Sequence, residues 1–324
     1  MNKRLRLFFA VVLTASHFAA PSAFAQDYPA KPVTAIVPFS TGSASDVIAR
    51  IVLDRMGASF GQKFIVNNIP AAGGVSGTLT ASKAPPDGYT IVMGAAGPTV
   101  VNKIFNPNLG YDPEKDFDPI SLYASLPNVV AVSAKLDVKT LAEFVDYVRR
   151  NPKVPYSSVG NGSSQHLAGA LFEQLVGAQM QHVPYRVTSQ LQADFVSGTV
   201  PASFQLLPNV IGAIKAGQGR ALAVASTRRL AALPDVPTAA EAGVKGFESA
   251  AWFGFLAPKG SPRTAIERLN REVVAAVADP AVRARFADFG AEPVSSTPEE
   301  FGRFISAEVV RWREIIRKGN ITSE

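Results

Sequence analysis

The sequence predicts an α/β fold with largely parallel sheets, because strand-like and helix-like segments alternate along most of the chain. Apolar, β-branched runs such as 33–39 and 154–158 are each followed by a loop of small residues and then by apolar residues at helical spacing. The composition favours a packed protein, since 47% of the residues are hydrophobic and only 18% are charged. With 324 residues, the chain can form one large domain or two domains that each bury a core.

Residues 1–25 have the pattern of a secretory signal peptide. The segment begins with three cations, continues with an apolar stretch that is too short and too interrupted to span a bilayer, and ends on Ala23-Phe24-Ala25. Cleavage after Ala25 lowers the formal net charge from +6 by three and leaves His166 and His182 as the remaining histidines. The chain has no Cys for a lipid anchor or a disulfide, so we expect a freely diffusing protein in the periplasm.

The strands are predicted from short apolar runs that end at turn residues. In order along the chain they cover 33–39, 63–67, 89–93, 154–158, 182–185, 202–207, 221–225 and 250–256.

The helices are predicted from apolar spacing and from capping residues. The first is capped by Ser45 or Asp46, and Ala72-Gly73-Gly74 opens the second. A capping box at 140–143 starts a helix that stops near Asn151, and short helices follow over 191–196 and 210–215. The helix over about 165–176 is expected to bury Leu167, Leu171 and Leu175.

The C-terminal part is predicted to be helical. One helix starts with Ser261 as N-cap and Pro262 at the first helical position, and a capping box at 297–300 starts the last helix. Apolar residues from Phe301 to Ile316 form a stripe on this helix, which is typical of core packing. The aromatic residues Trp252, Phe253 and Phe255 could line a pocket, but packing in a buried strand is the favoured interpretation.

Loops of small residues follow three of the predicted strands, at 40–46, 94–99 and 157–166. Each loop opens a helix, and the first turn of a helix carries unpaired N–H groups and a partial positive charge. Small residues let an anion approach this backbone, and hydroxyl groups add hydrogen-bond donors. Since all three loops lie at the carboxyl ends of strands, together they favour a binding site for a small anionic ligand.

Other kinds of site find less support in the sequence. The run 160–166 lacks the third glycine of a dinucleotide loop, and neither a P-loop nor a G-x-S-x-G elbow occurs. His166 could act as a base for Ser163 or Ser164, but no acid–base–nucleophile set accompanies it, so we expect no catalytic residue and no cofactor. The histidines and carboxylates have no metal-ligand spacing, and the modest, unclustered positive charge argues against nucleic acid as a partner.

An ordered set of short motifs resembles the periplasmic solute receptors of the tripartite tricarboxylate transporter family, often called Bug proteins. Each motif alone is modest, but together they run through essentially the whole chain after residue 25. They are Tyr28-Pro29 to Lys31-Pro32, Val37-Pro38-Phe39, 42–50, Ala72-Gly73-Gly74, the run from Lys83 to Tyr89, the run from Gly160 to Gly169, His182-Val183-Pro184-Tyr185, 221–224, 233–238 and 251–254.

The resemblance implies a two-lobed clamshell of the type II periplasmic-binding-protein kind, in which each lobe is a mostly parallel sheet flanked by helices. The first lobe would comprise 26–126 together with 247–324, and the second lobe 127–246. Two strands would cross between the lobes as hinges. The loaded receptor would act as a monomer and dock on a membrane permease, without a cofactor.

The resemblance also implies the ligand-binding residues. A carboxylate of the solute would be held by the first strand–helix loop and by the loop before the Gln165-His166 pair. The expected residues are Phe39, Ser40, Thr41, Gly42, Ser43, Ala95, Ala96, Gly97, Ser158, Gly160, Ser163, Ser164, His166, Tyr185 and Gln205. Asp46 is expected to fix its loop rather than touch the ligand, because two anions repel each other.

This chain departs from the family pattern at three places. Ser40-Thr41-Gly42-Ser43 replaces the usual Pro-Pro-Gly-Gly and offers more hydroxyls, and Arg186-Val187-Thr188 replaces Lys-Gly-Gly and would narrow the mouth of the pocket. Many members carry Asp where this chain has Gln205, which cannot neutralise an ammonium group. We therefore expect a carboxylic acid without an amine, such as a dicarboxylate or an aromatic acid.

Two other functions stay open from the sequence. The same pocket would serve a receptor that presents its ligand to a membrane sensor kinase. A periplasmic enzyme acting on an organic acid would need turnover, for which no residue set is evident.

Overall fold

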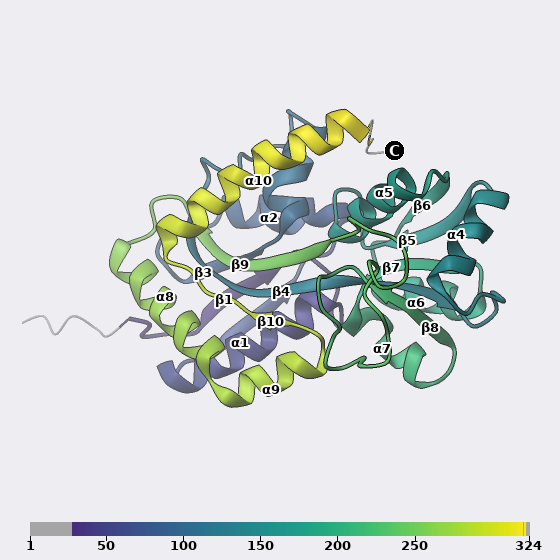
Figure 1. The fold of residues 1–324 in the computed structure, drawn as a ribbon. Coiled ribbons are helices and arrows are strands. Elements are labelled where there is room, and N and C mark those ends of the chain that lie inside the picture. Colours follow the sequence, from purple (N-terminus) through teal and green to yellow (C-terminus); the bar gives the residue numbers. More distant parts are fainter. Residues whose placement is uncertain (1–27, 320, 322–324) are drawn as a thin grey trace, which may run out of the picture.

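The computed structural model describes residues 28–319 and 321, so the expected signal peptide lies outside the described residues. Two sheets share one long strand, β4 (Phe117–Ser133), which runs through the middle of the molecule (Figure 1). No helix in the described part of the chain is long and apolar enough to cross a bilayer.

The first sheet contains the N-terminal strands. Its order is β2 (Phe64–Asn68), β1 (Val33–Val37), β3 (Thr90–Gly94), β9 (Ala250–Pro258) and the first half of β4, with β10 (Glu292–Pro293) also on β4. The pairs β1–β2 and β1–β3 are parallel, whereas β9 is antiparallel to both β3 and β4.

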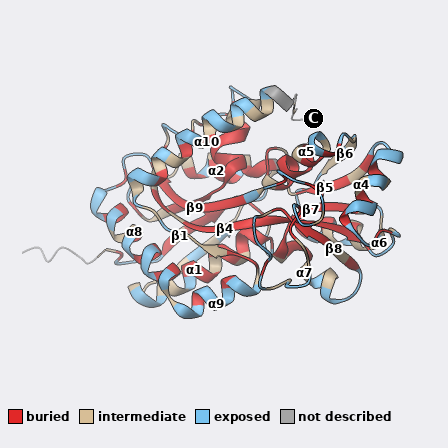
Figure 2. Ribbon diagram, viewed as in Figure 1, coloured by how far each residue is buried: buried red, intermediate tan, exposed pale blue. Residues whose placement is uncertain are grey.

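Helices cover both faces of this sheet, as expected for an α/β fold. Apolar residues of α1 (Ala44–Phe60), α8 (Arg263–Ala278) and α9 (Pro280–Asp288) pack on one face. The other face carries the 3₁₀ turn η1 (Ala72–Gly74), α2 (Val75–Ser82), the π-helical turn η2 (Gly97–Val101), α3 (Asn102–Phe105) and α10 (Pro298–Gly319). Strands β1, β3 and β9 between them are largely buried, and the outer sides of the helices are exposed (Figure 2).

The second sheet is built from the middle of the chain. Its order is β8 (Gly219–Val224), the second half of β4, β7 (Ala202–Leu206), β5 (Val154–Ser158) and β6 (Met180–Pro184). Its helices are α4 (Leu141–Arg150), α5 (Ser164–Val176), α6 (Thr188–Ser197) and α7 (Leu207–Lys215). A separate apolar core, which includes Phe144, Phe172 and Phe204, lies under α4 and α5.

The chain crosses between the two sheets at neighbouring points. The strand β4 pairs with β9 as far as Pro127 and with β7 and β8 from residue 128 onward. The returning segment is tied to it here, because the N–H of Asn128 donates to the oxygen of Ser249 at 2.8 Å. The fold class expected from the sequence is therefore present, with parallel strands in the outer part of each sheet and antiparallel strands at the crossing.

Local signals in the sequence had mixed outcomes. The strand 154–158 and the capping box at 297–300 are confirmed: Glu300 N–H donates to Thr297 Oγ1 at 3.1 Å, and Thr297 N–H donates to Glu300 Oε2 at 2.9 Å. The apolar stripe of α10 does pack in the core.

Three local predictions were wrong. Leu175 is 42% exposed, because α5 packs through Ala168, Phe172 and Val176, and Leu175 lies about 100° around the helix from Val176. Ser261 does not cap α8: its hydroxyl donates to Pro258 O at 2.7 Å, and the helix begins after Pro262. The cap of α1 is Ser43, one turn earlier than Asp46.

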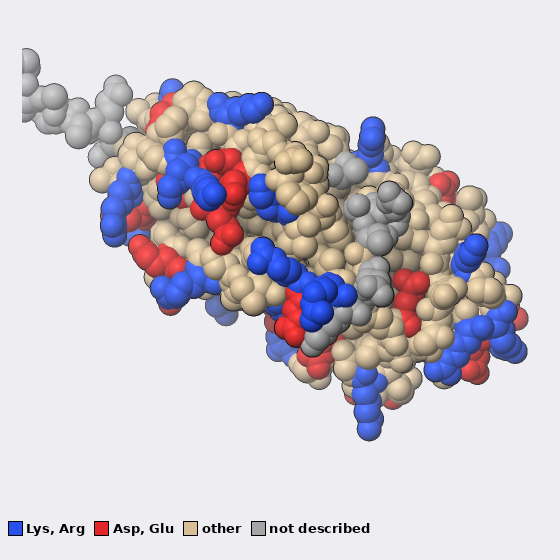
Figure 3. Space-filling model, turned by 90° about the horizontal axis from the view of Figure 1, so that it is seen from above, with Lys and Arg blue, Asp and Glu red and all other residues tan. Residues whose placement is uncertain are grey.

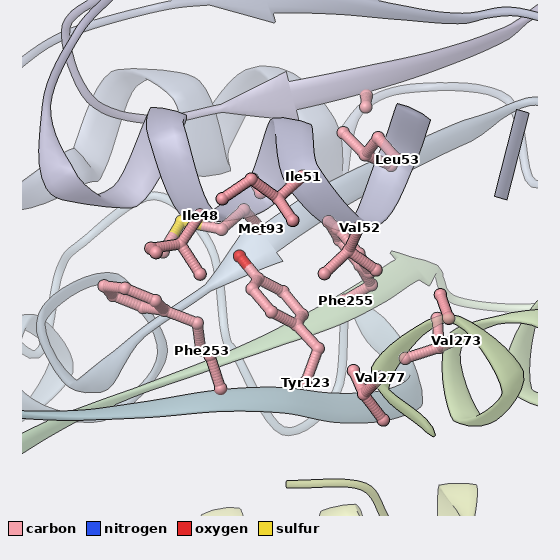
Figure 4. Close-up of a cluster of buried hydrophobic side chains, with 14 of the residues drawn as sticks. Ile48, Ile51, Val52, Leu53, Met93, Tyr123, Phe253, Phe255, Val273 and Val277 are labelled. Carbon is pink, nitrogen blue, oxygen red and sulfur yellow. The ribbon is translucent and has the colours of Figure 1, made fainter. Parts of the chain in front are cut away.

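The core on the α1 side holds one buried polar atom without a partner. Tyr123 projects from β4 toward α1, among Ile48, Ile51 and Met93 (Figure 4). No described residue lies within hydrogen-bond distance of its hydroxyl, and burial raises its pKa well above the usual value.

Charged side chains of both signs are interspersed on the face that carries α10 (Figure 3). Ion pairs include Arg263 with Glu267 at 2.7 Å and Arg311 with Glu308 at 3.0 Å. This face therefore presents no continuous strip of positive charge of the kind that a nucleic-acid backbone requires.

Candidate functional site

A small cavity lies where the loops that follow β1, β3 and β5 meet. The loops come from both sheets, and each leaves the carboxyl end of its strand, where open α/β sheets bind ligands. The cavity volume that a water centre can occupy is about 20 Å³, room for roughly one water molecule. Its lining residues are Phe39, Ser45, Ala95, Ala96, Gly97, Val159, Ser163, Ser164, Gln165, Leu206, Ala251 and Phe253.

The N-terminus of α1 reaches this cavity from the first sheet. Ser43 caps the helix, and its hydroxyl accepts a hydrogen bond from Asp46 N at 3.3 Å. Ala44 N donates to Asn209 Oδ1 at 2.8 Å. Within the described residues, Ser45 N–H is the group of this turn that has no protein acceptor, and Ser45 lines the cavity.

The N-terminus of α5 reaches the cavity from the second sheet. Ser163 caps this helix by accepting from His166 N at 3.3 Å. The N–H groups of Ser164 and Gln165 find no acceptor in the described part of the chain, and both residues line the cavity. Two helix N-termini therefore point free donors and positive dipole ends into one small space.

The carboxylate of Asp46, in the first turn of α1, is already hydrogen-bonded to protein groups. The Asp46 carboxylate accepts from Gly42 N at 2.9 Å, from Arg50 Nε at 2.9 Å and from Asn68 Nδ2 at 2.9 Å. It thus fixes the loop before α1, and none of the residues that line the cavity is acidic.

Two stacked histidines form hydrogen bonds with the loop before α5. The rings of His166 and His182 stack with their centroids 4.0 Å apart. His166 Nδ1 accepts from Gly162 N at 3.2 Å, and His182 Nε2 lies 2.5 Å from the Ser158 hydroxyl. Burial lowers the pKa of His166 to about 4, and burial together with His166 lowers that of His182 to about 3, so both rings are neutral at pH 7.

Direct hydrogen bonds also join the two sheets beside the cavity. Ser40 Oγ lies 2.8 Å from Thr188 Oγ1 and accepts from Thr188 N at 3.2 Å. Asn209, which receives the Ala44 N–H, donates through Nδ2 to Gln205 Oε1 at 2.8 Å. Gln205 Nε2 donates in turn to Ser157 O at 3.1 Å.

Six of the fifteen residues expected to bind ligand line this cavity. They are Phe39, Ala95, Ala96, Gly97, Ser163 and Ser164.

The other nine lie around it in different roles. Ser43 is a cap, Ser40 meets Thr188 of the second sheet, Gln205 holds Asn209 and Ser157 within the second sheet, and Thr41 and Gly42 are exposed. Tyr185 turns to Asp194, to which its hydroxyl donates at 2.6 Å. The remaining three, Ser158, Gly160 and His166, shape the loop before α5.

Sequence reasoning missed several lining residues. Gln165 directly follows the expected Ser164, and Ser45 lies two residues after the expected Ser43, so extending each expected loop one or two residues into its helix would have found them. Ala251 and Phe253 come from the crossing strand β9, where strand packing was the favoured interpretation; Phe253 both packs and lines the cavity. No sequence signal singles out Asn209.

A larger groove of about 540 Å³ lies between α5, α10 and the crossing strands. Its charged lining includes Arg228, Glu248 and Glu308, and Glu308 already accepts from Trp252 Nε1 at 3.0 Å and Trp312 Nε1 at 2.9 Å. No helix N-terminus opens into this groove, so we place the candidate site at the smaller cavity. The described residues hold no group of three or more His, Asp and Glu that could bind a metal ion.

Comparison with known sequences gives full-length relatives. Residues 48–321 match the profile of the tripartite tricarboxylate transporter family receptors. A protein from the tcbD-tcbE intergenic region of Pseudomonas sp. (strain P51) is 38% identical, over 89% of this chain and 86% of its own. Protein BugT of Bordetella pertussis is 34% identical, over 97% of each chain.

Solved structures of similar proteins superimpose on this chain over most of their length. A periplasmic transporter superimposes with a TM-score of 0.88 at 38% identity, covering 92% of this chain and all of its own. R. palustris Rpa4515, solved with adipate, has a TM-score of 0.88 at 33% identity and covers 91% of this chain and 99% of its own. MatC from Rhodopseudomonas palustris, solved with bound malate, has a TM-score of 0.82 at 31% identity and covers 89% of this chain and all of its own.

Proposed function

The chain belongs to the tripartite tricarboxylate transporter receptors, and we propose that it captures a small amine-free carboxylic acid and passes it to a membrane permease. The family consists of periplasmic solute receptors, which bind their ligands and are not enzymes. The proposal concerns the site, the ligand and the partner of this particular receptor.

The observation that carries the proposal is the meeting of two helix N-termini at one cavity. The free N–H groups of Ser45, Ser164 and Gln165 converge there from two different sheets. A carboxylate can accept several hydrogen bonds, and it is stabilised by the positive ends of both helix dipoles. Binding a carboxylate at this point therefore needs no arginine or lysine.

We propose that the two sheets are the cores of two lobes, 26–126 with 247–324 and 127–246. Each sheet has its own buried core, and the chain passes between them at β4 and at the segment before β9. Donors from both lobes converge on the ligand when the lobes are closed, so ligand binding shifts the equilibrium toward closure. A ligand larger than a water molecule enters while the lobes are apart and displaces the loops slightly from their present positions.

The proposed ligand class is a dicarboxylate or an aromatic acid. Two relatives were solved with adipate and with malate, which are dicarboxylic acids without an amine. The cavity here has no acidic lining residue, so an ammonium group would be desolvated without a counter-charge. Gln205 is fully buried and uses its amide on Ser157 and Asn209.

Calorimetric titration tests the ligand class. Adipate, malate and benzoate are titrated into the purified protein, with aspartate and glutamate as amine-bearing controls. We expect binding of at least one amine-free acid and none of the amino acids. Tight binding of aspartate or glutamate, with no binding of the other three, would overturn the assignment.

We further propose that residues 1–25 direct export and are removed after Ala25. N-terminal sequencing of the protein recovered from the periplasm tests this directly. A mature chain that starts at residue 26 is the expected result, and retention of the first 25 residues contradicts it.

A further inference from the structure

We propose that Asn209, together with the Ser40–Thr188 pair, forms a latch that holds the empty receptor closed. The inference rests on the proposed closure of two lobes, but it concerns residues that do not line the cavity. It follows from direct hydrogen bonds that join the two sheets.

Asn209 is placed so that it bridges the sheets through one buried side chain. It lies in the first turn of α7, is 2% exposed, and its Oδ1 accepts from Ala44 N at the start of α1. Its backbone oxygen accepts from Gln192 Nε2 at 3.0 Å, which ties α7 to α6. The Asn209 residue that accepts the N–H at the start of α1 is therefore anchored to α6, a helix of the second sheet.

A relay of amides fixes the orientation of the Asn209 side chain. Gln205 and Asn209 are four residues apart, and Asn209 Nδ2 donates to Gln205 Oε1 at 2.8 Å. Gln205 Nε2 donates to Ser157 O at 3.1 Å, so its amide cannot flip without placing two oxygens against each other. With Gln205 fixed, Asn209 must present its oxygen, and not its NH₂ group, to α1.

The second part of the latch lies at the start of α6. Thr188 is 4% exposed, and both its hydroxyl and its backbone N–H meet the Ser40 hydroxyl across the gap between the sheets. The two contacts flank the loop before α1 and hold it against α6 and α7. The free Ser45 N–H of this loop is thereby positioned at the cavity.

The latch affects affinity through the population of the closed state. In the open state water can hydrate Ala44 N–H and the Asn209 amide, whereas in the closed state each satisfies the other. Removing the Asn209 side chain leaves Ala44 N–H buried and unpaired only when the lobes are closed. The closed fraction then falls, and the apparent affinity for ligand falls by the same factor.

The test compares Asn209→Ala with a matched control, Asn270→Ala, by small-angle X-ray scattering without ligand. Asn270 Nδ2 donates to Ile120 O and Ser296 O at 2.8 Å, so the control removes partly buried hydrogen bonds on the first-sheet side only. We expect wild type and the control to scatter as the closed molecule and Asn209→Ala to have a larger radius of gyration. An expanded wild type, an unexpanded Asn209→Ala, or equal expansion of both variants would overturn the latch.

A second variant and a ligand arm complete the experiment. Thr188→Val keeps the shape of its side chain, loses the hydroxyl contact, and is expected to expand as well; if Asn209→Ala does not fold, a compact Thr188→Val overturns the proposal. For adipate or malate, whichever the wild type binds, Asn209→Ala should weaken binding about tenfold and Asn270→Ala less than twofold. If the wild type binds neither of these acids nor benzoate, the ligand proposal fails, while the scattering result still decides the latch.

Discussion

Replacing Gly73 with Ala should block closure of the receptor. Gly73 lies in η1, just before α2 on one face of the first sheet, and its φ is +64°. A Cβ here would fall well within 3.0 Å of the backbone oxygen of Asn161, which belongs to the loop before α5 in the second sheet. Ordinary contact starts near 3.4 Å, so the two loops must separate by roughly 1 Å.

The free-energy cost of Gly73→Ala has a conformational part and a steric part. A control substitution at a second glycine, Gly61, measures the conformational part alone. The left-handed backbone conformation costs an alanine about 1 kcal/mol wherever it occurs. Gly61 has the same φ of +64°, but a Cβ there would meet no atom within 4 Å. Gly61→Ala therefore carries the conformational cost alone.

The steric clash destabilises only the closed state, in which the two loops meet. A separation of roughly 1 Å stretches the 2.8 Å bond from Ala44 to Asn209 beyond hydrogen-bond range, at about 1 kcal/mol for each bond lost. It also moves the free N–H groups of α1 and α5 apart. We expect ligand affinity to fall at least tenfold, which corresponds to about 1.4 kcal/mol.

The assay is calorimetric titration of both variants with the acid that the wild type binds, together with thermal unfolding. Both variants should lose similar stability, but Gly61→Ala should keep the wild-type affinity. If Gly73→Ala binds the acid as tightly as Gly61→Ala, the loops of the two sheets do not limit closure and the reasoning is refuted.

Three further predictions follow from the site and the core. Tyr123→Phe removes a buried hydroxyl without a partner, so we expect the protein to become about 1 kcal/mol more stable, read as a rise of about 2 °C in Tm; a fall in Tm would indicate a hidden partner. The double variant Ser163→Ala/Ser164→Ala should bind ligand weaker by about 1–3 kcal/mol in a titration, and unchanged affinity would show that the two hydroxyls do not contact the ligand. Because the pKa of His166 is about 4 in the fold and about 6.5 when unfolded, only the unfolded chain gains its proton between these values. His166 should therefore contribute about 3 kcal/mol to the drop in the free energy of unfolding as pH falls from 6.5 to 4, and the lowered pKa of His182 adds to the drop in the same direction. Denaturant unfolding at pH 7 and 4.5 checks this, and an equal loss in His166→Gln would show that His166 is not the cause.

The sequence predicted the parts of this protein that local rules determine. Alternation of apolar runs gave the α/β class, the capping box at Thr297 gave the start of α10, and the small-residue loops gave the approximate helix starts at the site. A helix N-terminus can be recognised locally, because the cap and the unpaired N–H groups lie within one turn of each other.

Pairings between distant residues could not be predicted in the same way. Asn209 meets Ala44 across 165 positions of sequence, and nothing near either residue indicates the other. The exposure of Leu175 has a similar origin, because the face that α5 buries depends on which neighbours pack against it.

The chemistry of the latch explains how a closed receptor can still exchange its ligand. The bonds between the loops before α1 and the helices α6 and α7 join neutral groups, and each contributes only about 1 kcal/mol. A few bonds of this strength can hold the lobes together in the absence of ligand and still break often enough for a solute to enter. The proposed carboxylate ligand would accept hydrogen bonds from Ser45, Ser164 and Gln165 N–H with its negative charge, and such bonds are roughly twice as strong as neutral ones. The ligand would therefore add its own hydrogen bonds to those of the latch and leave the closed state more stable than the latch alone can make it.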